Sequence, residues 1–172
     1  PILPLHVQTL GVGEKSLAPS TGILISGYSM AAALSATLLG RASRSYSPRR
    51  LLILGLAAGA ATVLPMALVP TYSALLTLAV ALGLASGGAL TLCYTIGGLM
   101  VPASERTTAF GFFSAAALFG GSISPLVAGG LSHLDLRGIY YLDAVLFLAA
   151  ALLAFMSRLG GGSRDLSQRV AT

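Results

Sequence analysis

Long apolar stretches separated by short polar breaks make up most of the 172-residue chain. A bilayer core about 30 Å thick is crossed by roughly 20 apolar residues in a helix. Five stretches satisfy that length, and Asp143 in the last of them is their single charged residue. The pattern therefore predicts five membrane-spanning helices, at residues 20–39, 51–69, 73–100, 108–131 and 139–157.

Turn residues and charges occupy the breaks between these stretches. Across five alternating spans, eight arginines fall on one side, whereas the other side receives Lys15 and Arg137. Lys and Arg gather on cytoplasmic loops. We therefore expect a cytoplasmic C-terminus and an external N-terminal segment. The breaks are residues 41–50, 70–72, 102–106 and 132–138.

Composition narrows the class of protein further. The chain is 55% hydrophobic and only 9% charged, whereas soluble domains average about 25% charged residues. This composition disfavours a soluble enzyme, a disordered tail and a disulfide scaffold. The net charge of +5 does not indicate nucleic-acid binding, because the basic residues lie in the breaks. The predicted fold is all-α, a polytopic helical bundle whose first partner is the lipid bilayer.

The chain divides into three predicted parts. Residues 1–19 are expected to be the end of a truncated helix followed by an external loop. Their first five residues are apolar but too short to span a bilayer, and they lack the basic region of a signal peptide. Residues 20–158 form the five-helix bundle. Residues 159–172 form a polar cytoplasmic tail that we expect to be disordered.

Small residues recur at helical spacing in four of the five spans, and such positions let helices approach closely in lipid. Ordinary packing and a bundle that moves both remain open, and the recurrence favours movement. Pro125 lies mid-span and predicts a kink. The small positions are Gly22, Ser26, Ser29, Ala33, Ala36 and Gly40; Gly55 and Gly59; Gly83 and Gly87; and Gly120, Gly121, Ser124, Gly129 and Gly130.

Hydroxyl side chains cluster at mid-depth in two of the spans. Polar residues inside spans usually face the bundle or a water-filled cavity. These hydroxyls suit hydrogen bonding to a ligand or to a neighbouring helix, and both roles stay open. The third span carries Thr91, Tyr94 and Thr95, and the first carries Ser26, Tyr28 and Ser29.

Ionisable residues give little sign of catalysis. Asp143 lies about one turn from the external end, where it can reach interfacial water or pair with Arg137, and this structural role is favoured over ion coupling. His6 and His133 fall in external segments and are expected to be solvated. We find no nucleophile triad, metal-ligand cluster, phosphate-binding loop or paired intramembrane carboxylates. No enzyme, cofactor or metal site is therefore predicted.

Two motifs resemble the major facilitator superfamily of secondary transporters. Residues 101–111, VPASERTTAFG, are similar to its V-P-x-x-E-R-x-x-A-F-G turn. Residues 40–50, GRASRSYSPRR, resemble its G-R-x-x-D-R-x-G-R-R loop, with Arg44 in the place of the acid and Ser47 in the place of the glycine. Residues 120–130 are similar to the G-P-x-x-G-G stretch of exporters, with Ser124 where a glycine precedes the proline.

The resemblance covers roughly residues 1–158 and implies one six-helix half that lacks most of its first helix. The eroded loop, and Ala79 where the N-terminal half often has Arg, imply helices eight to twelve of the C-terminal half. Drug- and sugar-efflux members are the nearest in appearance. The implied function is alternating-access transport across the cytoplasmic membrane, most simply efflux of drug-like or sugar-like solutes. The implied partners are the other half, a small-molecule substrate and a coupling proton.

The resemblance also implies roles for single residues. The third span would line the cavity, which makes Thr91, Tyr94 and Thr95 the first substrate-binding candidates and Ser26, Tyr28 and Ser29 the second. The first and fourth spans would meet the other half. The implied gating residues are Gly40, Arg41, Arg49, Arg50, Glu105, Arg106, Gly120, Gly121, Pro125 and Gly129.

A helical membrane scaffold that binds a partner and transports nothing is the alternative. Such a scaffold would have the same rows of glycines and the same basic cytoplasmic face as a transporter. A transporter needs a water-accessible face at Tyr94, whereas a scaffold does not. In either case, five spans alone cannot form a two-half pathway, so we expect residues 1–172 by themselves not to transport.

Overall fold

The computed structural model describes residues 2–132 and 136–160, and in these residues it contains helices and no strand. Five helical segments are long and apolar enough to cross a membrane, which confirms the predicted number of spans. The elements are α1 (Ile2–Thr9), α2 (Glu14–Ala42), α3 (Pro48–Met66), α4 (Tyr72–Ser86), α5 (Ala89–Met100), the short 3₁₀ turn η1 (Ala103–Glu105), α6 (Arg106–Ser132) and α7 (Leu136–Gly160).

Helix α2 begins at Glu14, earlier than the sequence pattern predicts. The polar residues Glu14 and Lys15 and the ring of Pro19 favour a loop, yet all three lie within the helix. An acidic residue in the first turn complements the positive end of the helix dipole. Pro19 lies early in the helix and removes one backbone hydrogen bond. The first span is therefore longer than its apolar core.

The third span is divided into α4 and α5 by Gly87 and Gly88. Both glycines keep nearly helical backbone angles, with φ of −60° and −84°, so the chain continues in the same direction through a loosened turn. The break lies where α2 crosses. A Cβ added at Gly87 would lie 2.3 Å from the Cα of Ala32, and glycine therefore permits a contact between backbones that no other residue allows.

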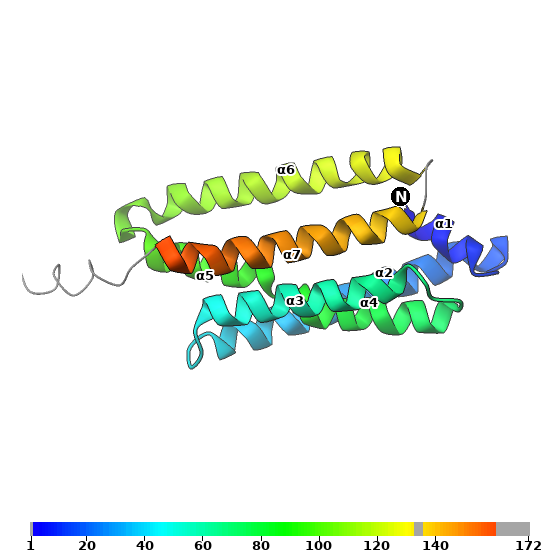
Figure 1. Cartoon of the computed structure of the whole chain (residues 1–172), viewed down its shortest axis with the longest axis horizontal. Coiled ribbons are helices and arrows are strands. Elements are labelled where there is room, and N and C mark those ends of the chain that lie inside the picture. The colour runs from blue at the N-terminus through cyan, green and yellow to red at the C-terminus, as the bar shows by residue number, and fades with distance from the viewer. Residues whose placement is uncertain (1, 133–135, 161–172) are drawn as a thin grey trace, which may run out of the picture.

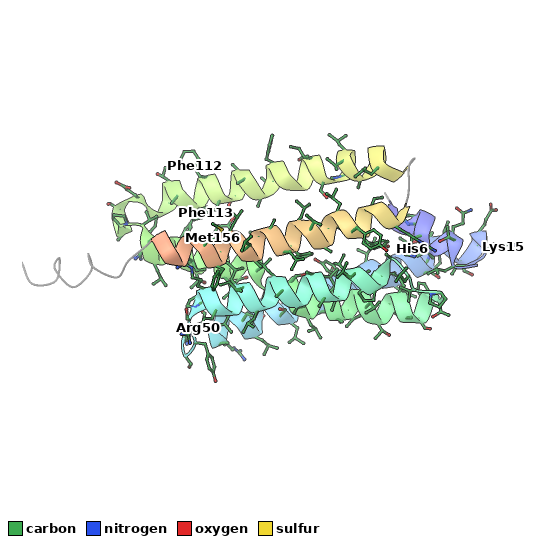
Figure 2. All side chains as sticks on the ribbon, viewed as in Figure 1. His6, Lys15, Arg50, Phe112, Phe113 and Met156 are labelled. Carbon is green, nitrogen blue, oxygen red and sulfur yellow. The ribbon has the colours of Figure 1, made fainter. Side chains whose placement is uncertain are left out.

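The helices run side by side along the long axis of the molecule (Figure 1). The α2–α3 and α5–α6 connections lie at one end, which we call the arginine end. Helix α1 and the α3–α4 connection lie at the opposite end, the α1 end (Figure 1). Figure 2 places Arg50 at the first end and His6 and Lys15 at the second. The spans therefore alternate in direction, as the charge pattern predicts.

The buried core lies among α2, α3, α4 and α7. Leu24, Val63 and Leu75 are almost completely buried in one cluster, which also contains Tyr140 of α7. A second cluster, nearer the arginine end, is centred on Leu92 of α5. Helix α2 packs mainly on α4, and α3 packs mainly on α7. We call α2, α3, α4 and α7, on which α5 also packs, the four-helix unit.

Helix α6 stands apart from this unit, as Figure 1 shows. No residue in its most apolar window is buried, and Leu118 and Leu126 are 73% and 75% exposed. The helix is continuous through Pro125, so the expected kink does not break it. Large apolar side chains along a helix require lipid or another protein around them. Most of the α6 surface is therefore available to such a neighbour.

Candidate functional site

A groove of about 650 Å³ separates α6 from the four-helix unit. Its walls come from α2, α3, α4, α6 and α7, and most of its lining is apolar. Ligand pockets typically measure about 300–1,000 Å³ and combine apolar walls with a few polar groups. The polar groups here are Tyr28 and Ser29 of α2, Ser124 of α6, and Tyr140 and Asp143 of α7. The groove therefore has the size and lining of a site for a small apolar molecule.

Two of the three hydroxyls predicted on α2 line the groove. Tyr28 and Ser29 contribute to its wall, whereas Ser26 is exposed and lies outside the lining. The helix is oriented by its opposite side, which packs on α4. There, a Cβ at Gly27 would lie 3.3 Å from a methyl of Val80, and Ser35 donates a hydrogen bond to the Leu84 carbonyl at 2.7 Å. The packing of α2 on α4 thus directs Tyr28 and Ser29 into the groove.

Tyr94, the central candidate of the third span, contacts α6 at the arginine end. Its hydroxyl is 2.7 Å from the hydroxyl of Ser114, and its ring lies edge-on to Phe110 and Phe113, with centroids 5.7 and 5.9 Å away. We call Tyr94, Phe110, Phe113 and Ser114 the aromatic clamp. Gly97 makes room for it, because a Cβ there would lie 2.2 Å from the Phe113 ring. In this structure Tyr94 binds a neighbouring helix, one of the two roles left open by the sequence.

The two threonines beside Tyr94 have local contacts. Thr95 donates its hydroxyl to the Thr91 carbonyl at 2.9 Å, within the same helix. The Thr91 methyl would lie 3.6 Å from a Cβ added at Gly40 of α2. Neither residue lines the groove, so their role in substrate binding remains a prediction.

A second, more polar pocket of about 490 Å³ lies at the α1 end, lined in part by His6, Thr9, Arg137 and Tyr140. His6 is 8% exposed, and its Nδ1 forms a hydrogen bond with the Tyr140 hydroxyl. The expectation that His6 is solvated is therefore wrong, whereas His133 lies outside the described residues. Burial lowers the pKa of His6 below its ordinary value of 6.5.

The residues predicted to gate transport lie in two places, along the later half of α6 and at the arginine end. Gly120 and Pro125 line the groove, and a Cβ added at Gly120 or Gly121 would contact nothing within 4 Å. The other group lies at the arginine end, where the Nε of Arg106 donates to the Val101 carbonyl at 3.3 Å. Their gating roles stay predictions. This second group consists of Gly40, Arg41, Arg49, Arg50, Glu105 and Arg106; Gly129 lies farther along α6.

Residues 1–169 match the family model described as the Major Facilitator Superfamily. The chain belongs to the Major Facilitator Superfamily. Membership and the five apolar helices together make it a multi-pass membrane protein.

Two named proteins illustrate where the chain lies within the superfamily. It is 30% identical over 161 residues to the multidrug resistance protein MdtG of Salmonella heidelberg (strain SL476). It is 28% identical over 158 residues to the class H tetracycline resistance protein of Pasteurella multocida. The alignments cover 91% and 90% of this chain but 39% of each relative. The chain thus spans about two fifths of the length of these Major Facilitator Superfamily proteins.

Proposed function

We propose that this chain forms most of one half, the C-terminal half, of a secondary transporter that exports drug-like molecules across the cytoplasmic membrane by alternating access. The arginine end and the C-terminus face the cytoplasm in this proposal. Its principal support is the groove between α6 and the four-helix unit. Similarity to a multidrug resistance protein and a tetracycline resistance protein supports the same class of substrate.

The lining of the groove favours drug-like over sugar-like substrates. A sugar carries hydroxyls on most of its carbons, and each buried hydroxyl needs a hydrogen-bond partner. The groove offers only five polar side chains among nineteen lining residues. A molecule with a broad apolar body and one or two polar or cationic groups matches this ratio, with Tyr28, Ser29 and Ser124 as hydrogen-bond partners.

The exposed faces of α2 and α6 support a second half as the missing partner. Gly22 of α2, and Gly120 and Gly121 of α6, each have open space where a Cβ would lie. Small residues of this kind let helices approach one another closely in lipid. The other half, supplied by residues outside this chain, would cover these faces and close the groove. Rocking of the two halves would then move α6 and its glycines.

Thiol accessibility in the full-length gene product tests the cavity. Cys93 is exposed and is first replaced by Ala. Single cysteines are then placed at Tyr28, Ser29 and Ser124 in the groove, and at Thr91, Tyr94 and Thr95 on α5. Leu148, which is 51% exposed on α7, serves as the lipid-facing control. A water-soluble maleimide should label the groove positions and spare Leu148, and ethidium should slow that labelling.

Two outcomes would contradict the proposal. If no groove or α5 position reacts, no aqueous cavity exists and a non-transporting scaffold becomes the better explanation. If the positions react but the full-length protein exports neither ethidium nor tetracycline from cells, the cavity serves another solute. As a further check, residues 1–172 alone should give no vectorial flux in liposomes.

A further inference from the structure

The pocket at the α1 end, which we call the outer pocket, differs in chemistry from the groove. Four of its nine lining residues are polar, namely His6, Thr9, Arg137 and Tyr140, and none of its described lining residues is acidic. Arg137 therefore gives the outer pocket a positive charge. The charged residue of the groove is an acid, Asp143. The two cavities thus suit different ligands.

The outer pocket lies level with the ends of two membrane spans. Leu68 and Pro70 come just after the end of α3, and Arg137 and Tyr140 lie in the first turns of α7. The ends of spans coincide with the lipid headgroup layer, which adds roughly 5–7 Å to each side of the hydrocarbon core. A phospholipid beside α3 and α7 would therefore carry its phosphate at the depth of this pocket.

His6 and Tyr140 form a buried wall of the outer pocket that always retains one hydrogen-bond donor. Each is 8% exposed, and His6 Nδ1 shares a hydrogen bond with the Tyr140 hydroxyl. If Tyr140 donates that bond, the Nε2–H of His6 remains available. If Nδ1 donates it, the hydroxyl proton of Tyr140 remains. Thr9 adds no further donor, because its hydroxyl bonds to the His6 carbonyl at 2.7 Å.

Arg137 lies at the exposed rim of the outer pocket. It already interacts with another group in the structure. A guanidinium has five N–H donors, however, and its planar fork also pairs well with the oxygens of a phosphate. Leu10 and Leu68 add apolar surface to the same lining. An anionic phosphate attached to an apolar chain matches both parts of the pocket.

We propose that the outer pocket binds the phosphate of an anionic phospholipid. Arg137 is the ionic partner, the His6–Tyr140 pair supplies a hydrogen bond, and the glycerol and first acyl carbons lie against Leu10 and Leu68. Phosphatidylglycerol is favoured over phosphatidylcholine, because the described lining offers no carboxylate to pair with a choline cation. The site goes beyond the proposed export function, since its ligand is a membrane lipid and not a transported solute.

Native mass spectrometry of the full-length gene product in detergent tests the site without a substrate. Phosphatidylglycerol should remain bound to the wild type. Arg137→Gln should weaken that binding about tenfold, because a charged hydrogen-bond partner of the phosphate is lost. Lys15→Gln is the matched control. It removes a positive charge at the same end of the molecule (Figure 2), but Lys15 does not line the outer pocket, so the affinity should be nearly unchanged.

A thiol probe tests where the lipid binds. In a Cys93→Ala background, Leu68→Cys places a thiol at a lining position whose native side chain is 64% exposed. Phosphatidylglycerol added to the micelles should slow its reaction with a water-soluble maleimide, and Arg137→Gln should remove this protection. Phosphatidylcholine and inorganic phosphate should protect much less. Lys15→Cys, outside the pocket, should react at the same rate in every case.

Three results would overturn the proposal. Equal weakening by Arg137→Gln and Lys15→Gln would mean that the lipid responds only to the overall charge of this end. An unchanged reaction rate at Leu68→Cys would place the lipid elsewhere. Equal protection by inorganic phosphate would mean that the pocket takes a soluble anion. If Arg137→Gln does not fold, Arg137→Lys keeps the charge but loses the fork, and full affinity in that variant would contradict the guanidinium contact.

Discussion

Helices α2 and α6 are both long, apolar and rich in small residues, yet they are held in opposite ways. Helix α2 approaches α4 so closely that a Cβ at Gly83 would lie 2.5 Å from the Tyr28 carbonyl oxygen. Helix α6 touches the rest of the chain mainly through the aromatic clamp and its contacts with α7. Similar composition therefore leads to a fixed contact in one case and an open groove in the other.

The difference lies in where the small residues meet a neighbour. Between α2 and α4, glycine faces backbone, and hydrogen bonds from Ser35 to Leu84 and from Tyr72 to Ser20 lock the pair together at 2.7 and 2.8 Å. On α6, Gly120 and Gly121 face open space. A small residue stabilises only when a partner fills the room that it leaves. Movement of α6 is therefore least hindered beside Gly120 and Gly121.

The largest effect is expected from a methyl group added at the close contact between α2 and α4. The same addition on the open side of α6 gives the comparison. Gly87→Ala should destabilise the protein by about 1–3 kcal/mol, because overpacking against the Ala32 backbone forces α2 to shift. Gly121→Ala is the matched control. It should be neutral or stabilising by up to about 1 kcal/mol, the gain in helix propensity. Thermal unfolding in detergent measures both, and equal losses at the two sites would refute the contrast.

A smaller effect is expected when the α2–α4 lock loses one hydrogen bond. Ser35→Ala leaves the Leu84 carbonyl without its side-chain donor, and hydrogen bonds between membrane helices average about 0.6 kcal/mol. The melting temperature should fall slightly. Thr37→Ala provides the control, since the Thr37 hydroxyl bonds within its own helix. A larger loss at Thr37 than at Ser35 would mean that the interhelical bond contributes nothing.

Removing one contact of the aromatic clamp should change the mobility of α6 more than the stability of the protein. Tyr94→Phe keeps the ring contacts and removes the hydroxyl that meets Ser114, at a cost of about 0.6 kcal/mol. Spin labels on α6 and α7 should then report a broader distance distribution. Phe112 lies on the outer side of α6 and is 73% exposed, so Phe112→Leu should leave the distribution unchanged. An unaltered distribution in Tyr94→Phe would show that the hydroxyl does not restrain α6.

The smallest expected effect concerns α1 and depends on pH. Burial lowers the pKa of His6 from 6.5, so the docked helix binds fewer protons than the undocked one in mildly acidic solution. Docking should be complete above about pH 6.5 and weaken as the pH falls through the lower value of the docked state. Hydrogen exchange of α1 amides at pH 7.5 and pH 5, corrected for intrinsic rates, measures this. His6→Gln should remove the pH dependence, and its persistence in that variant would exclude His6 as the cause.

The spans could be predicted because bilayer thickness imposes a length that the sequence displays directly. The break at Gly87 and Gly88 could not, since two glycines fit an unbroken apolar run equally well. Glycine pairs at spacing of four, such as Gly83 and Gly87, did mark a close contact. The longer row of small residues from Gly22 to Gly40 did not identify the face of α2 that packs on α4. Four residues of that row are exposed, whereas Ala31 and Ser35 beside them are buried.

The candidate site was predictable only in part, because its walls come from five elements. Tyr28 and Ser29 were identified as polar residues at mid-depth, and they do line the groove. Tyr94 carries the same signal, but its neighbour Ser114 lies on another helix, which the sequence cannot place. The pair of His6 and Tyr140 is separated by 134 positions. No local pattern connects two residues that far apart.

The position of the aromatic clamp near one end of α6 also has a mechanical consequence. The clamp holds the first turns of the helix, whereas the groove opens beside its later half, from Gly120 to Ala128. The helix continues for about 27 Å beyond Ser114, so a tilt of roughly 5° about the clamp displaces the far tip by about 2–3 Å. A tilt of α6 would thus be centred on its contact with Tyr94. An angular change too small to disturb packing at this contact would be enough to admit or expel a water molecule at the tip.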